Sequence, residues 1–145
     1  MSHFSDLTPV ASQNEKGVSY KYYEGQWSIL PNFVNLPAIS SGVLDNMNIS
    51  LAKQAENFGF DFTASMEAPQ DGVYSFWLTS DDGSKLYVND SLLIDNDGGH
   101  AMVTKKAQVV LKQGWYNIQV PYFNNVGGAG LEVWVVLPDQ RRVKL

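Results

Sequence analysis

Hydrophobic and polar residues alternate along much of the chain between residues 58 and 137. In residues 58–67 polar or small residues separate five apolar positions, which are Phe58, Phe60, Phe62, Ala64 and Met66. This period of two is typical of a β-strand with one buried face. The apolar pattern predicts further strands over residues 73–79, 103–111, 115–122 and 131–137.

Turn residues separate these strands. Pro69-Gln-Asp-Gly72 joins two of them, since proline fixes φ and glycine permits the reversal. Leu86-Tyr-Val88 and Leu92-Leu-Ile94 flank Asn89-Asp-Ser91, a pattern that predicts a short hairpin. Residues 18–27 form an aromatic strand broken by Gly25, and residues 28–57 have no steady period. We expect the latter to be a long loop packed over one edge of the fold.

No window of the chain keeps a helical period over three turns. About eight short strands at close spacing predict an all-β fold, an antiparallel β-sandwich. The 145 residues suffice for one domain with a real hydrophobic core. We expect a leader or linker over residues 1–17, the sandwich over residues 18–138, and a C-terminal linker over residues 139–145.

Composition narrows the classes of function. The net charge is −5, and the basic residues form no stripe longer than Lys105-Lys106 and Arg141-Arg142. Nucleic acid is therefore not an expected partner, because phosphate binding needs clustered positive charge. The chain has no cysteine, which excludes disulfides, thiolate catalysis and zinc sites of the cysteine type. No apolar run approaches the roughly 20 residues of a membrane span, so we expect no membrane insertion, and the N-terminal residues lack the apolar core of a signal peptide.

The most unusual stretch is T-S-D-D-G-S-K-L-Y-V-N-D, residues 79–90, in which Asp81 stands directly beside Asp82. An ordinary Asp-Asp-Gly turn is one interpretation, and a bound cation is the other. Calcium takes six to eight oxygen ligands, and residues 81–97 contain five Asp against one Lys. Neighbouring side chains of a strand point to opposite faces. For both carboxylates to reach one ion the backbone must bend sharply, as a cis peptide would allow.

Catalytic patterns are weak. The only histidines are His3 and His100, and no serine stands in a G-x-S-x-G turn. A glycosidase needs two carboxylates about 5–9.5 Å apart across a sugar ring, and nothing singles out Glu132 or Asp97 as the partner of Asp81. Asp95-Asn-Asp-Gly98 is out of register for an EF-hand. The four tryptophans could stack on sugars, but aromatic residues in strands more often pack in the core or on a sheet face.

Three further stretches resemble the PA-14 (protective-antigen) domain family. They are Gly72-Val-Tyr-Ser-Phe-Trp-Leu-Thr-Ser-Asp-Asp-Gly-Ser-Lys-Leu-Tyr-Val-Asn-Asp90, Leu93-Ile-Asp-Asn96 and Gly114-Trp-Tyr-Asn-Ile118. The resemblance covers roughly residues 18–138 and implies a jelly-roll-like β-sandwich. Flocculin-type lectins and many bacterial glycosidases and adhesins carry such domains. The details are most similar to bacterial versions appended to carbohydrate-active enzymes.

The resemblance also implies a site. In the flocculin-type lectins the paired Asp are joined by a cis peptide and bind Ca²⁺ together with an Asn and two carbonyls of a later loop. The matching positions here are Asp81, Asp82 and Asn124 as side-chain ligands, with Val126 and Gly128 as carbonyl donors. Asn125, Asp97 and His100 are expected to border the ligand, although a solvated loop residue is the simpler interpretation of His100. Gly128 replaces the bulky aromatic residue of some lectins, so this loop brings no ring to a sugar.

We therefore expect a noncatalytic, calcium-dependent carbohydrate-binding module. It would come from a larger extracellular, cell-surface or periplasmic protein, with a glycan and the catalytic domain of that protein as partners. The alternative is a structural or docking spacer of a glycosidase that binds no sugar by itself. A small hydrolase is the third possibility, and turnover of aryl-glycosides by the isolated domain would be required to support it.

Overall fold

A computed structural model describes residues 7–10 and 17–145 of the chain. Most of the expected leader, including His3, lies outside the described residues. The ten strands found in these residues are β1 (Val18–Glu24), β2 (Ser40–Leu44), β3 (Phe58–Ala68), β4 (Gly72–Asp81), β5 (Ser84–Val88), β6 (Ser91–Asn96), β7 (Val103–Leu111), β8 (Gly114–Asn124), β9 (Gly130–Val136) and β10 (Arg142–Lys144). The one helical element in the described residues is a 3₁₀ turn, η1 (Phe33–Asn35). In this part of the chain no helix has the length and apolar character that crossing a membrane requires.

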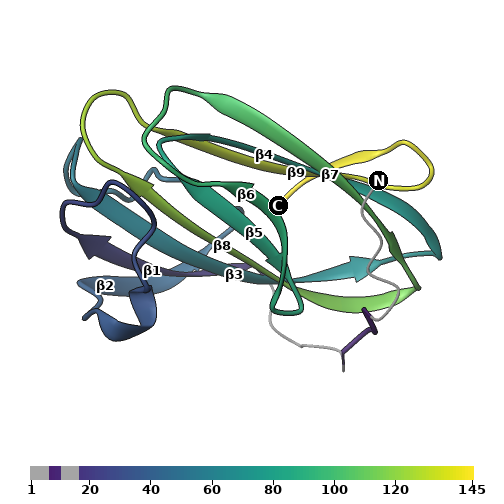
Figure 1. The fold of residues 1–145 in the computed structure, drawn as a ribbon. Coiled ribbons are helices and arrows are strands. Elements are labelled where there is room, and N and C mark those ends of the chain that lie inside the picture. The colour runs from purple at the N-terminus through teal and green to yellow at the C-terminus, as the bar shows by residue number, and fades with distance from the viewer. Residues whose placement is uncertain (1–6, 11–16) are drawn as a thin grey trace.

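Two antiparallel sheets pack face to face (Figure 1). The larger sheet has the strand order β2-β1-β3-β8-β5-β6, and the smaller one has the order β10-β9-β4-β7. The predicted antiparallel β-sandwich is confirmed. The strands with clean alternation were the easiest to predict, and β7 spans the same residues as its prediction.

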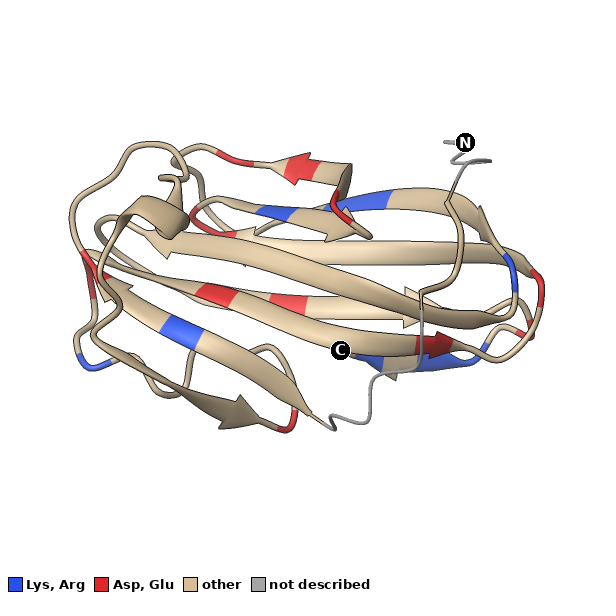
Figure 2. Cartoon of the chain, turned by 90° about the horizontal axis from the view of Figure 1, so that it is seen from below, with Lys and Arg blue, Asp and Glu red and all other residues tan. Residues whose placement is uncertain are grey.

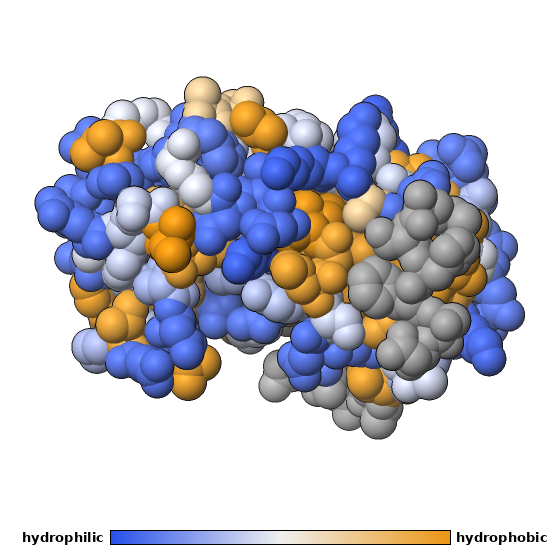
Figure 3. Space-filling model, in the orientation of Figure 1, coloured by the Kyte–Doolittle hydropathy of each residue, from blue (hydrophilic) through white to orange (hydrophobic). Residues whose placement is uncertain are grey.

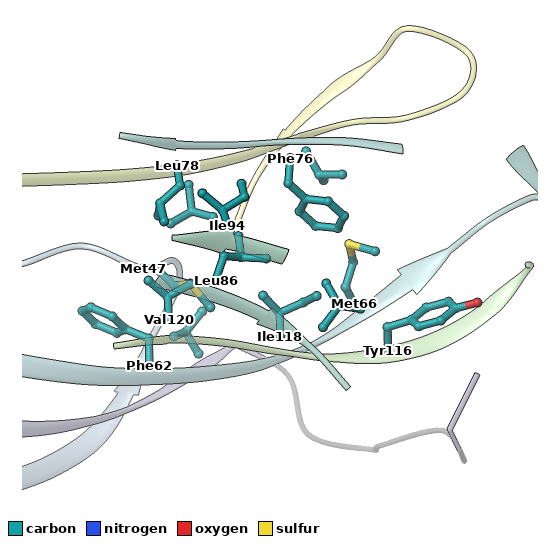
Figure 4. Close-up of a cluster of buried hydrophobic side chains, with 14 of the residues drawn as sticks. Met47, Phe62, Met66, Phe76, Leu78, Leu86, Ile94, Tyr116, Ile118 and Val120 are labelled. Atoms are coloured by element: carbon teal, nitrogen blue, oxygen red, sulfur yellow. The ribbon is translucent and has the colours of Figure 1, made fainter. Parts of the chain in front are cut away.

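The core lies between the sheets and is rich in aromatic side chains (Figure 4). On β4 the residues Tyr74, Phe76 and Leu78 are all 0% exposed. In the close-up Phe76 and Leu78 point from the smaller sheet toward side chains of the larger one, among them Ile118 and Val120. Each large apolar side chain that is fully buried contributes about 1.5–3 kcal/mol relative to exposure, so the alternation that predicts the strands also accounts for their packing.

Two expectations were wrong. Residues 40–44, expected within a long loop, form β2 and pair with β1 from Tyr22↔Ser40 to Val18↔Leu44. They gave no alternating signal because this edge strand is exposed on most of its length. Residues 139–145 were expected to be a linker, but β10 pairs with β9 and Leu145 N donates to Val133 O at 2.9 Å. The C-terminal segment is therefore part of the smaller sheet.

The predicted hairpin is present as β5 and β6, but its turn has two residues, Asn89 and Asp90, because Ser91 already belongs to β6. Asn89 and Asp90 have φ angles of 47° and 67°, the left-handed conformation that Asn and Asp tolerate better than most residues. The Asn89 side chain then ties the turn to its surroundings, since its Oδ1 accepts from Asn117 N at 2.8 Å and its Nδ2 donates to Thr8 O at 2.8 Å.

Buried tyrosines fasten the two turns that precede β4 and β8. Tyr74 donates its hydroxyl to Gln70 O at 2.6 Å, and Tyr116 donates to Lys112 O at 2.7 Å, each four residues back along the chain. Asp71 Oδ1 accepts from Gln113 N at 2.7 Å and so joins the two turns. Strands β4 and β8 both start at this end of the sandwich and run toward the opposite end, where Asp81 and Asn124 terminate them.

Candidate metal and ligand site

Asp81 and Asp82 lie where β4 ends, and the peptide bond between them is cis. The Asp81 carbonyl accepts a hydrogen bond from the Tyr122 hydroxyl at 2.6 Å. Burial, together with the negative charges of Asp81 and Asp82, raises the pKa of Tyr122, so its hydroxyl stays protonated and keeps donating. Burial and the adjacent Asp82 also raise the pKa of Asp81, as expected for two carboxylates held together without a counterion.

Asp82 connects two loops that are distant in sequence. Its side chain is 7% exposed, and its Oδ1 accepts from His100 N at 3.0 Å while its Oδ2 accepts from Asn125 N at 2.8 Å. Hydrogen bonds to a charged group each contribute about 1.5–3 kcal/mol. One carboxylate oxygen therefore holds the loop after β6, and the other holds the loop between β8 and β9.

Asn124 ends β8 and is completely buried. Its Nδ2 donates to Ala55 O at 3.0 Å, whereas its Oδ1 has no hydrogen-bond partner in the described part of the chain. Buried acceptors are rarely left unpaired. Asp81, Asp82 and Asn124 together form what we call the carboxylate–amide cluster.

The loop after Asn124 passes over Asp81. A side-chain carbon at Gly128 would lie 3.5 Å from Asp81 Oδ2, so the loop is close to this carboxylate. Val126 and Gly128 are exposed, with the Val126 side chain 64% accessible. The structure thus brings all five expected ligand positions to one end of the sandwich.

The other three expected residues border the cluster. His100 contributes its backbone N–H to Asp82, and its ring nitrogens lie 2.7 Å from Ala101 O and 2.8 Å from Asn96 O. Burial lowers the pKa of His100, but the two carbonyls and the negative charges of Asp82 and Asp81 outweigh burial and raise it. Both ring partners are carbonyls, which only accept, so the doubly protonated ring satisfies both contacts.

Asp97 uses its carboxylate to hold backbone. Its Oδ1 accepts from Leu30 N at 2.9 Å and from Gly98 N at 2.7 Å. Gly83 lies against it, because a side-chain carbon at Gly83 would be 2.7 Å from Asp97 Oδ1 and 2.5 Å from a Phe123 ring carbon. The loop before η1 is thereby fixed next to the cluster, which the sequence did not predict.

A second set of supporting residues was missed altogether, in the segment before β3. Asn57 N donates to Asn125 O at 2.8 Å, and Gly127 N donates to Glu56 Oε2 at 2.7 Å. Asn57 has a φ of 60° and a buried Oδ1 without a partner among the described residues. This segment has no periodic pattern, and its contacts span about 70 positions, so no local sequence signal marks it.

A buried polar network lies beneath Asp82. The hydroxyls of Ser80 and Ser84 are 2.6 Å apart, and Ser80 donates to Asp82 O at 2.9 Å. Asn96, 1% exposed, donates from Nδ2 to Val103 O at 3.0 Å, and its Oδ1 is the third unpartnered buried oxygen in the described residues. The three unpartnered oxygens thus lie close to the two residues that Asp82 binds, Asn125 and His100. Asn124 precedes Asn125 and Asn57 donates to it, whereas Asn96 accepts at its carbonyl from the His100 ring.

The donor set suits a hard cation. Carboxylates, an amide oxygen and carbonyls are the ligands that Ca²⁺ prefers. No three His, Asp or Glu side chains gather closely enough in residues 7–10 and 17–145 to hold a metal by themselves, so a cation here would depend on Asn124 and on loop carbonyls. The unpartnered Asn124 oxygen beside Asn125 is consistent with that dependence.

The sandwich and its loop-borne carboxylates define a β-sandwich module with a candidate ligand site at one end. The sequence model for the PA14 domain matches residues 15–144. The chain belongs to the PA14 domain family, and the resemblance noted in the sequence is confirmed. A comparison with curated proteins found no match.

Solved structures support the same fold. An anti-sigma factor domain-containing protein superposes with a TM-score of 0.76 at 18% identity, over 90% of this chain and 46% of the other. A PA14 sugar-binding domain from an RTX adhesin superposes with a TM-score of 0.74 at 14% identity, over 90% of this chain and 94% of the other. A β-glucosidase from Kluyveromyces marxianus in complex with glucose superposes with a TM-score of 0.65 at 22% identity, over 88% of this chain and 16% of the other. The chain thus spans less than half of the first protein and about a sixth of the third.

Proposed function

We propose that the chain is a noncatalytic carbohydrate-binding module whose binding depends on Ca²⁺. The observation that carries the proposal is the carboxylate–amide cluster: Asp82, next to Asp81, accepts from Asn125 N, and the preceding Asn124 has a buried Oδ1 with no hydrogen-bond partner among the described residues. Family membership supports it, as does the likeness to an adhesin domain described as sugar-binding. In this proposal Asp81, Asp82 and Asn124 hold the ion with the carbonyls of Val126 and Gly128.

Each residue has a distinct role. When bound, Ca²⁺ would supply a hard centre that accepts sugar hydroxyls as further oxygen ligands. Asp82 keeps the two loops in place through its hydrogen bonds to His100 N and Asn125 N. Asp97 and His100 shape the rim through backbone contacts, and Asn125 lies between the ion ligands and the segment before β3.

The proposal includes a setting for the domain. A module of this kind acts on glycans outside the cell, at the cell surface or in the periplasm, beside the catalytic domain of a larger protein. Figure 2 shows Lys and Arg scattered along the strands and loops rather than gathered into a broad basic surface. With the net charge of −5, this distribution supports a glycan rather than a nucleic acid as the partner.

A glycan array with the fluorescently labelled domain tests the proposal. We expect binding in millimolar Ca²⁺, loss of binding in EDTA, and loss in Asp81→Asn even with Ca²⁺. Asp90→Asn is the matched control, because it removes the same charge from an exposed hairpin that extends away from the cluster. Glycan binding that survives both EDTA and Asp81→Asn would refute the metal mechanism.

A structural or docking spacer is the second candidate, favoured by the likeness to 16% of a β-glucosidase chain. The spacer would be favoured if the array showed no glycan binding while calorimetry showed that the domain binds Ca²⁺. Turnover of aryl-glycosides by the purified domain would contradict both candidates.

A further inference from the structure

The outer face of the smaller sheet carries a row of aromatic and cationic side chains across its four strands. Trp77 on β4 pairs with Lys106 on β7 and with Trp134 on β9, and Trp134 pairs with Lys144 on β10. These residues face outward because their neighbours on β4, such as Phe76 and Leu78, point into the core. Directly opposite side chains of antiparallel strands have Cβ atoms about 4.5–5.5 Å apart, so the two indoles are adjacent.

Positive charges lie against both indoles. Lys106 Nζ is 4.0 Å from the Trp77 ring centre, and Lys144 Nζ is 5.8 Å from the Trp134 ring centre. Arg142 Cζ is 5.5 Å from the first ring and 6.0 Å from the second. Such contacts at exposed sites are weak, so the cations can move to a better partner.

Within residues 7–10 and 17–145 these three cations have no carboxylate partner. The one salt bridge in the described part of the chain joins Arg141 to Asp139. Glu132, an acidic residue of this face, accepts from Trp134 Nε1 at 3.0 Å. A protein with a net charge of −5 thus gathers three exposed, unpaired cations around two indoles.

The face is hollowed between these residues. The depression has a volume of about 550 Å³ and is lined by both indoles, by Lys106 and Arg142, by Thr79 and Thr104, and by Glu132, whose carboxylate accepts from the Trp134 indole. The two threonine hydroxyls lie 2.7 Å apart and are exposed. Ring faces, hydroxyls and unpaired cations therefore line one shallow surface.

We propose that this face binds an anionic polysaccharide, a chain of pyranose rings that carry carboxylate or sulfate groups. The C–H face of a pyranose stacks on an indole, and the anionic groups pair with Lys106, Arg142 and Lys144. Arg binds carboxylate and sulfate through two parallel hydrogen bonds, and the threonine hydroxyls bind ring hydroxyls. Nucleic acid fits less well, because a single row of three cations contacts few phosphates.

The proposal does not rest on the carboxylate–amide cluster or on a metal. Trp77 precedes Asp81 by four residues on β4, which places the two regions roughly 13 Å apart along the strand. A polysaccharide long enough could touch both, yet binding at the outer face requires neither Asp81 nor Ca²⁺.

Affinity electrophoresis of the full chain in EDTA tests the proposal with sodium polygalacturonate as the anionic probe and dextran as the neutral one. We expect retardation by polygalacturonate, little by dextran, and weakening as salt rises. Trp134→Ala should bind at least about tenfold more weakly. Arg142→Gln and Lys144→Gln keep both indoles and should each weaken binding, whereas Lys112→Gln, a matched change in an exposed turn, should not.

Three results would overturn the proposal. They are the absence of retardation in EDTA, equal binding by Lys144→Gln and Lys112→Gln, and retardation by polyglutamate that matches polygalacturonate and persists in Trp134→Ala. The last would identify the face as a binding surface for acidic peptides. Thermal melting of each variant separates lost binding from lost folding, and the EDTA buffer separates this test from that of the metal site.

Discussion

Replacing Asp81 with asparagine tests whether the paired carboxylates bind a cation, because Asp81 and Asp82 differ in what they do for the protein alone. Asp82 accepts two backbone hydrogen bonds from separate loops. Among the described residues the Asp81 side chain has no hydrogen-bond partner other than Asp82, and burial together with the adjacent Asp82 charge raises its pKa. Asp81→Asn therefore removes repulsion in metal-free protein and removes a ligand when Ca²⁺ is present.

The expected magnitudes separate the two conditions. At about 100 times the dissociation constant, a bound ion adds about 2.7 kcal/mol to the free energy of unfolding. For a domain of this length that is a rise in Tm of about 5–10 °C. In EDTA, Asp81→Asn should melt at or above the temperature of the unsubstituted protein. In Ca²⁺ it should lack the rise.

The assay is thermal melting by circular dichroism, with EDTA and then with excess Ca²⁺. Asp82→Ala is the informative comparison, since the loss of two hydrogen bonds to a charged group should cost about 3 kcal/mol or more even in EDTA. A Tm rise in Asp81→Asn equal to that of the unsubstituted protein would refute the assignment of Asp81 as a ligand. A fall in EDTA for Asp81→Asn would show that its carboxylate stabilises the turn itself.

Three further outcomes follow from contacts described above. Tyr74→Phe should lower the free energy of unfolding in urea by about 1–2 kcal/mol, because Gln70 O loses its donor, and glycan binding should not change. Gly83→Ala should lower Tm and weaken Ca²⁺ binding measured by calorimetry, since its new carbon would clash with the Phe123 ring; unchanged affinity would contradict the close approach. Burial raises the pKa of Asp61, so the folded state binds the Asp61 proton more tightly than the unfolded state does. The ionised carboxylate therefore lowers the free energy of unfolding at neutral pH, and this loss of stability disappears as the pH falls. Asp61→Asn should therefore raise Tm at pH 7.5, by an amount that shrinks toward pH 4; a gain independent of pH would exclude this cause.

The parts of the fold that could be predicted are those with one buried face. Burial makes most of the inward-facing residues of β3, β4 and β8 apolar, and that constraint is visible in the sequence. Strand β2 was not predicted because most of its side chains face solvent, and β10 was not predicted because its three exposed residues show no period. Pairing with a neighbour, rather than burial, defines both edge strands.

Some residues of the candidate site could likewise be predicted from the sequence, and others could not. Two adjacent Asp at the end of a strand are visible as an unusual pair, and the resemblance placed Asn124 beside them. The contacts of Glu56 and Asn57 with the Asn124 loop could not be predicted, because they join segments brought together only by the completed sandwich. Sequence reasoning favoured packing over sugar stacking for the tryptophans. Trp77 and Trp134 lie on a sheet face, where cations lie against their rings.

The side of the molecule seen in Figure 3 is mixed: hydrophilic residues cover most of it, and hydrophobic patches interrupt them, one of them near the centre of the view.

The tyrosine-fastened turns before β4 and β8 divide the domain into a fixed end and a variable end. Tyr74, Tyr116 and the Asp71–Gln113 contact set where both strands begin, so the register of each sheet does not depend on the loops at the other end. The loops at the other end contribute contacts to Asp82 and Leu30 instead. The domain is therefore suited to loop grafting: a library in residues 98–99 and 126–129 that keeps Asp97, His100 and Asn125 would alter the rim of the site while retaining those hydrogen bonds.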